Sequence, residues 1–110
     1  MEGVPVLYGF LDRKEHGTDL RVWCRWCCHW HIHGAGGTPV GEAVHRLAHC
    51  YAGDSAYDDG GYWIEITDTP YSTAKPMVRA ATHAQQRAIG AGRISSAVKR
   101  LRAQPEPRPL

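Results

Sequence analysis

The chain has 110 residues, which is enough for one small domain with an appended segment. Its core is short of large apolar side chains, because one Phe and two Met stand against 12 Gly and 7 Pro, so we expect a bound metal to supplement the packing. No apolar stretch approaches the roughly 20 residues that span a bilayer, and the N-terminus lacks the apolar run of a signal peptide. The sequence therefore predicts a cytoplasmic protein without a membrane partner, in which clustered cysteines stay reduced and bind metal.

The net charge of +2 conceals an uneven distribution along the chain. Residues 1–74 carry five basic and ten acidic side chains, whereas residues 75–110 carry eight basic ones and only Glu106 as an acidic one. This division predicts an acidic globular part followed by a basic arm. Counterion release would attract such an arm to nucleic acid. The alternative is a solvated helix face that packs on the acidic part of the same domain.

Four segments of the N-terminal part have the composition of β-strands. Residues 4–11 are apolar but contain Pro5, so they form an edge strand at best. Apolar and polar side chains alternate over residues 20–23, which lead into the first cysteine. Residues 30–33 would form the returning strand. Residues 62–67 are the last convincing strand. Together these segments predict a short antiparallel sheet.

A helix is expected to follow the loop of glycines at residues 34–37. Thr38 is a suitable N-cap, Pro39 suits the first helical position, and Gly53 would end the helix. The apolar residues that recur at helical spacing are Val40, Val44, Leu47, Ala48 and Tyr51.

The C-terminal part predicts two further helices, over residues 77–89 and 93–103, separated by a glycine turn. The expected organisation is therefore a zinc-binding α+β domain at residues 1–70, a basic helical arm at residues 71–104 and a disordered tail at residues 105–110. The fold class is α+β, as a small zinc-stapled finger with a short antiparallel sheet and one helix, followed by one or two basic helices.

Two groups of candidate metal ligands follow one another in an order that resembles a zinc finger. Cys24 and Cys27 have the spacing of a knuckle, in which both sulfur atoms reach one ion. His45, His49 and Cys50 supply the second group, and the gap of 17 residues after Cys27 is slightly longer than in most fingers. Thiolate and imidazole ligands together suit zinc, and four protein ligands make a closed, structural site.

The sequence leaves the second pair of ligands open. His45 and His49 are four residues apart, so on a helix they share a face and chelate together. Cys50 lies nearer the apolar stripe of that helix, where an inward metal would sit. We favour His45 with Cys50, and His49 is the alternative to either; His31 and His33 are the remaining candidates.

Catalysis has little support in the sequence. Cys28 and His29 would suit a nucleophile and its base, but adjacent residues point apart. Glu42 and Glu65 are available as general bases, yet neither stands in an H-x-E or HExxH arrangement. We therefore expect neither an enzyme nor a small-molecule substrate.

Three motifs carry a family resemblance: WCRWCCHWHIHG at residues 23–34, HRLAHC at 45–50, and Ser55-Ala56-Tyr57 followed by Gly61-Tyr62. The chain resembles, over about residues 20–66, the small uncharacterised zinc-finger-like proteins of actinobacteria and their phages with WCxxCxxWHxHG, HRxAHC and SPYxxxGY motifs. It departs from them at Ala56, Cys28 and His29. The resemblance implies metal binding at Cys24, Cys27, His45 and either His49 or Cys50, and little about activity.

The C-terminal segment also partly resembles a helix-turn-helix over residues 88–101. The candidate nucleic-acid contacts are Arg87, Arg93, Lys99, Arg100 and Arg102. The function predicted from the sequence is a zinc-stabilised nucleic-acid-binding protein, a small regulator or an accessory protein of a mobile element.

The alternative is a zinc-stabilised protein-interaction module that binds no nucleic acid. Its anchors would be exposed aromatic side chains, because Trp and Tyr dominate binding hot spots. The candidates are Trp26, Trp30, Tyr57 and Trp63.

Overall fold

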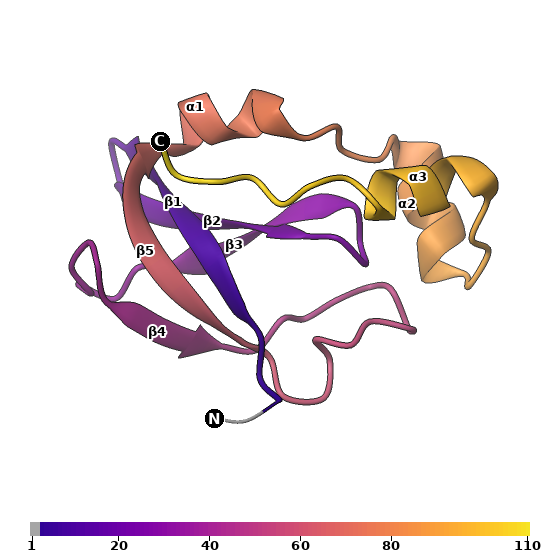
Figure 1. Ribbon diagram of the computed structural model, residues 1–110, viewed down its shortest axis with the longest axis horizontal. Coiled ribbons are helices and arrows are strands. Elements are labelled where there is room, and N and C mark those ends of the chain that lie inside the picture. The colour runs from indigo at the N-terminus through magenta and orange to yellow at the C-terminus, as the bar shows by residue number, and fades with distance from the viewer. Residues whose placement is uncertain (1–2) are drawn as a thin grey trace.

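The computed structural model describes residues 3–110, and its centre is a mixed five-stranded sheet that curves into a half-barrel (Figure 1). The strand order is β3-β2-β1-β5-β4; β1 and β5 are parallel, and all other neighbours are antiparallel. The strands are β1 (Val6–Lys14), β2 (Gly17–Cys24), β3 (His29–Gly34), β4 (Ala43–Arg46) and β5 (Tyr62–Pro70).

The helices are short and follow the last strand. They are α1 (Tyr71–Ala74), a 3₁₀ turn η1 (Lys75–Met77), α2 (His83–Gly90) and α3 (Ser96–Arg102). Figure 1 shows α2 and α3 beyond the turn that joins β2 to β3, while the last residues of the chain run back toward α1. Within residues 3–110, every helix is too short or too polar to cross a membrane.

A cluster of aromatic rings fills the core between the sheet and α1. The ring of Trp30 packs edge-on against Phe10, Trp23 and Tyr71, with centroid distances of 6.0, 5.7 and 5.1 Å. Phe10 and Trp23 are almost completely buried. Because such rings bury large areas, this cluster makes a large apolar contribution to the fold.

The strand β1 lies in the middle of the sheet, and not at its edge as the sequence predicts. Pro5 precedes the strand, so its missing N–H group does not interrupt the pairing. Gly9 allows the side chains of the neighbouring strands to pack directly against the backbone of β1. A Cβ atom at this position would lie 2.5 Å from a methyl carbon of Ile64 and 2.6 Å from one of Leu20, which is too close.

The predicted helix over residues 38–51 is wrong. Residues 43–46 form β4, which pairs with β5, and Gly41 takes a φ of +93° that no α-helix accommodates. The apolar residues at helical spacing also do not share a buried face, because Val40 and Leu47 are 48% and 57% exposed. Pairing with β5 satisfies the backbone here in place of helical hydrogen bonds.

The predicted pair of C-terminal basic helices is a second correction to the fold. Residues 78–82 are not helical, and α2 and α3 have only eight and seven residues. Both helices pack on the body of the protein through Ile89, Val98 and Leu101, so they are part of its core and do not stand off as an arm. The fold is a half-barrel with short helices, and not a finger followed by helices.

The segment over residues 105–110, for which the sequence predicts a disordered tail, has no regular structure but is held against the sheet. Pro107 is buried, and the backbone N–H of Leu110 donates to the hydroxyl of Thr69 at 2.8 Å. The carboxylate of Glu106 pairs with Arg25, in the turn that joins β2 to β3.

Candidate metal centre

Four possible metal ligands converge at the end of the sheet nearest α2 and α3. Cys24, Cys27, His31 and Cys50 each offer one ligand atom, and these atoms all lie within 4.8 Å of one another. The sulfur atoms of Cys24 and Cys50 are 3.7 Å apart. Two sulfur atoms bound tetrahedrally to zinc at about 2.3 Å stand about 3.8 Å apart, so the observed separation suits a shared ion. These four residues could therefore bind one metal ion.

The last residue of β2 and the turn that follows it supply two of the candidate ligands, Cys24 and Cys27. The backbone N–H of Cys27 points at the sulfur of Cys24 at 3.4 Å, a contact that stabilises a thiolate. Cys28 follows in the left-handed region with a φ of +54°, which reverses the chain into β3. The chelating pair is thus set by the local path of a tight turn.

His31 reaches the site because of the register between β2 and β3. Cys24 is opposite His29, and Val22 is opposite His31. Opposite residues share a face of the sheet, and so do residues two apart on one strand, so His31 lies on the same face as Cys24.

Cys50 comes from the long loop between β4 and β5, which internal hydrogen bonds hold in place. The carboxylate of Asp58 accepts from the backbone N–H of Cys50 at 3.3 Å, and the hydroxyl of Ser55 accepts from the N–H of Tyr57 at 3.0 Å. The loop re-enters the sheet at Gly61, where a Cβ atom would lie 2.2 Å from the carbonyl oxygen of Arg46.

The three thiols compete for protons in the absence of a cation. Contacts with Cys27 and then with Cys50, followed by burial, raise the pKa of Cys24. The contact with Cys24, followed by that with Cys50, lowers the pKa of Cys27. One ionised sulfur is thus held by its protonated neighbours. A divalent cation would remove this competition, because it lets every ligand sulfur be a thiolate.

Tyr62 connects the fourth ligand to a second histidine. Its hydroxyl lies 3.2 Å from Nδ1 of His31 and 2.5 Å from Nε2 of His33, and the tyrosine is completely buried. Burial raises the pKa of Tyr62, whereas burial and the nearby His31 lower that of His33 to about 4, so both groups are neutral near pH 7. This contact engages one nitrogen of His31 and leaves the other for a metal, as in many metal-binding histidines.

Two of the predicted ligands lie outside the cluster. Nε2 of His45, on β4, lies 2.7 Å from the carbonyl oxygen of Gly60, and its ring packs against Trp63. His49 is exposed and has a φ of +52°. The sequence did contain a signal for His31 as a metal ligand. This histidine is four residues after Cys27, on a predicted strand that would run back alongside the strand ending at Cys24.

The predicted nucleic-acid contacts fall into two groups. Arg102 is engaged within the protein: both terminal nitrogens bind the carboxylate of Asp54, at 2.6 and 2.9 Å, and Nε donates to the carbonyl of Trp26 at 3.1 Å. The other four are exposed, and none forms an ion pair with a carboxylate of residues 3–110; they are Arg87, Arg93, Lys99 and Arg100.

The aromatic residues predicted to form an anchor patch are not exposed. Trp30 and Tyr57 are buried, and Trp26 and Trp63 are half-buried. The guanidinium of Arg102 covers the ring of Trp26 at 5.3 Å from its centroid. These rings support the fold and the surroundings of the cluster.

Cys28 has the properties of a structural cysteine. It is completely buried, its sulfur contacts the carbonyl oxygen of Arg25 at 3.4 Å, and burial raises its pKa. A protonated, buried thiol is a poor nucleophile. The neighbouring His29 lies against the carbonyl of Trp30 instead.

Comparisons with protein-family models, with curated protein sequences and with solved structures give no match for this chain. The resemblance to zinc-finger-like proteins of actinobacteria and phages therefore stays a prediction. The functional argument rests on the geometry of the cluster and on the placement of charge.

Proposed function

We propose that Cys24, Cys27, His31 and Cys50 bind one zinc ion, and that this ion is structural. Three thiolates and one imidazole are a common structural zinc set, and four protein ligands leave no position open for a substrate or an activated water. The cluster also joins parts of the chain that are distant in sequence, because Cys50 lies 26 residues after Cys24. A metal here offsets the small apolar core of a chain of this length.

We further propose that the protein binds nucleic acid through the exposed basic residues of its C-terminal segment. The observation that carries this proposal is the uncompensated charge of Arg87, Arg93, Lys99 and Arg100, which have no carboxylate partner within residues 3–110. The single acidic residue of that segment is itself engaged by Arg25. Unpaired cations on one segment favour a polyanionic partner.

The metal centre would hold this segment in place through the turn between β2 and β3. The carbonyl of Cys28 accepts from the N–H of Ala81 at 2.8 Å, just before α2. At α3, Arg102 donates to the carbonyl of Trp26, while Arg25 donates to the carbonyl of Arg102. Each contact starts within or next to the pair of chelating cysteines. Zinc would therefore pre-organise the basic residues for binding.

The test combines metal analysis with titrations of a short DNA duplex and a single strand, followed by fluorescence anisotropy at several salt concentrations. We expect one zinc per chain and an affinity whose logarithm falls linearly with the logarithm of salt concentration. Arg93→Gln with Arg100→Gln should reduce that slope by about 2 and weaken both probes. Arg13→Gln is the matched control, because Arg13 is exposed on β1. No binding even at the lowest salt would refute the nucleic-acid proposal and leave the zinc proposal standing.

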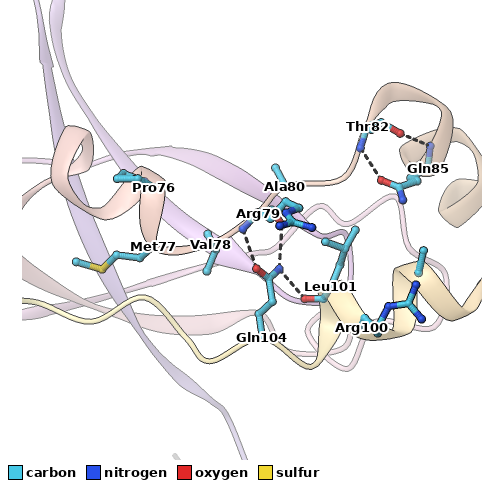
Figure 2. A pocket seen from close by; sticks show the side chains of 11 residues that line it. Pro76, Met77, Val78, Arg79, Ala80, Thr82, Gln85, Arg100, Leu101 and Gln104 are labelled. Atoms are coloured by element: carbon cyan, nitrogen blue, oxygen red, sulfur yellow. Dashed lines mark hydrogen bonds between the residues drawn. The ribbon is translucent and has the colours of Figure 1, made fainter.

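A second candidate function, binding of a protein partner, is favoured by a groove beside α3 (Figure 2). The groove has a volume of about 830 Å³; Val78 and Leu101 supply apolar surface, and Arg79 and Arg100 are its charged lining residues. The side chain of Gln104 bonds both the N–H and the carbonyl of Arg79, at 2.8 and 2.9 Å. No aromatic ring lines the groove, so it lacks a platform for stacking bases.

Such a groove suits a polypeptide with apolar and acidic side chains. Ala97→Glu would place a carboxylate in the groove. A protein captured from a nuclease-treated extract should be lost from this variant and kept by Arg13→Gln. A variant that retains every captured protein would exclude the groove as their binding site.

A further inference from the structure

One cysteine of the metal cluster is accessible to solvent, whereas its neighbours are not. Cys24, Cys27 and Cys28 are completely buried, while Cys50 is only partly buried. The sulfur of Cys50 is also the one that lies 3.7 Å from that of Cys24. A small oxidant that diffuses to the cluster would therefore meet Cys50 first, with a second sulfur in contact behind it.

We propose that Cys50 and Cys24 form a peroxide-sensitive thiol pair, whose oxidation to a disulfide releases the metal. This inference rests on the proposed zinc centre. The Cys50 thiolate attacks one oxygen of hydrogen peroxide, so that an S–O bond forms, the O–O bond breaks and the other oxygen leaves as water after protonation. The Cys24 thiolate then attacks the sulfur of Cys50, which forms the S–S bond and expels the sulfenic oxygen as a second water. The pair loses two electrons, and peroxide gains them.

The geometry selects Cys24 as the second sulfur. A disulfide bond is about 2.05 Å long, so the two sulfur atoms need to approach by less than about 2 Å. Cys28 is excluded because its sulfur contacts the carbonyl of Arg25 and lies outside the cluster. Cys27 is a proposed ligand and is as buried as Cys24, but the close sulfur–sulfur contact of Cys50, at 3.7 Å, is with Cys24. Movement of the loop that carries Cys50 closes the Cys24–Cys50 distance with least disturbance of the strands.

Metal release would follow because a disulfide sulfur is a poor ligand. The site would keep Cys27 and His31, and two protein ligands do not close a structural zinc site. The turn that contacts Ala81 and Arg102 would then lose its metal support. Oxidation would thus loosen the C-terminal segment from the end of the sheet.

The experiment treats the zinc-loaded full chain with hydrogen peroxide and follows zinc release with a chromogenic chelator. Trypsin then separates the cysteines, because cleavage after Arg25, Arg46 and Arg79 leaves Cys24 in peptide 22–25, Cys27 and Cys28 in peptide 26–46, and Cys50 in peptide 47–79. We expect release of the bound zinc, a loss of about 2 Da from the intact chain, and a disulfide between peptides 22–25 and 47–79. Thiol reductant with added zinc should restore the starting protein.

Cys28→Ser is the matched control, since Cys28 is as buried as its neighbours but lies outside the cluster. It should release zinc and form the same cross-link. A cross-link that involves peptide 26–46, or zinc release with sulfinic acid and no cross-link, would overturn the proposal. Purified protein that binds no zinc would refute the metal proposal alone, because the same peptide map on metal-free protein still decides whether Cys24 and Cys50 pair.

Discussion

Two regions of the half-barrel are held together by different forces. At the aromatic cluster, Phe10, Trp23, Trp30 and Tyr71 bury large rings against one another, with no ligand involved. At the candidate metal centre, the ligand atoms of three cysteines and one histidine lie within 4.8 Å of one another. The two regions share β2 and β3, so they are neighbours in the fold. Apolar packing is present whenever the chain is folded, whereas the proposed metal centre would depend on a bound ion and on the redox state of its thiols. The stability of the sheet end nearest α2 and α3 would therefore depend on metal and oxidant, whereas that of the aromatic cluster would not.

The largest expected effect comes from removal of a metal ligand. Cys24→Ser should abolish stoichiometric zinc binding and lower the free energy of unfolding by on the order of 5 kcal/mol, because binding energy is also folding energy at such a site. Metal analysis and denaturant titration measure the two quantities. His31→Ala should behave in the same way, whereas His45→Ala should keep its zinc. The reverse result for the two histidines would exclude the proposed ligand set.

The next effect separates apolar packing from metal binding. Trp30→Ala should lower the free energy of unfolding by about 3–5 kcal/mol, because it removes a ring that contacts three others. Zinc stoichiometry should stay at one in the protein that remains folded. Calorimetry together with metal analysis of the folded fraction tests this, and a variant that folds fully but has lost its zinc would show that the two regions are not separable.

A smaller effect is expected when the support behind His31 is removed. Tyr62→Phe keeps the ring and deletes the hydroxyl that contacts His31 and His33. Zinc affinity should fall about 10- to 100-fold, as is typical for groups that orient a metal-binding histidine. Competition with a chelator measures the affinity, and Co²⁺ substitution should show altered ligand-field bands. Tyr8→Phe is the control, because it removes a tyrosine hydroxyl from an exposed residue of β1.

The smallest effect concerns the contact between α3 and the turn that joins β2 to β3. Arg102→Gln removes the ion pair with Asp54 and the bond to the carbonyl of Trp26. Because Asp54 is half exposed, solvent screens the pair, and we expect a loss of only about 1 kcal/mol. Amide hydrogen exchange should increase in α3 and leave β1 and β5 unchanged. An increase spread evenly over the sheet would contradict a local role.

The sequence anticipates the features that depend on neighbouring residues. The spacing of Cys24 and Cys27 makes them a chelating pair in any tight turn, and the structure places them together. The predicted strands at residues 20–23, 30–33 and 62–67 lie within β2, β3 and β5, because alternation of apolar residues directly reflects a half-buried strand.

Features that depend on distant residues could not be read in the same way. Residues 38–51 have apolar side chains at helical spacing, yet pairing of β4 with β5 outweighs that local preference. On the wrongly predicted helix His45 and His49 share a face, and Cys50 lies near the apolar stripe. The prediction therefore favoured His45 with Cys50 and kept His31 only as a remaining candidate, whereas the structure brings together Cys50 and His31. The charge pattern likewise marked Arg102 as available for nucleic acid, although Asp54, 48 residues earlier, binds it.

By itself, then, the sequence determined that Cys24 and Cys27 lie together as half of a candidate metal site, because their separation along the chain is enough to fix their separation in space. For the other half the sequence favoured Cys50 with His45, and only the tertiary structure brings His31 into the cluster in place of His45. Cys50 reaches the cluster because hydrogen bonds within the loop between β4 and β5 hold that loop in place. His31 reaches it because the register of β2 and β3 places His31 on the same face as Cys24. Register and loop path are set by many contacts between distant residues, and no local spacing encodes them.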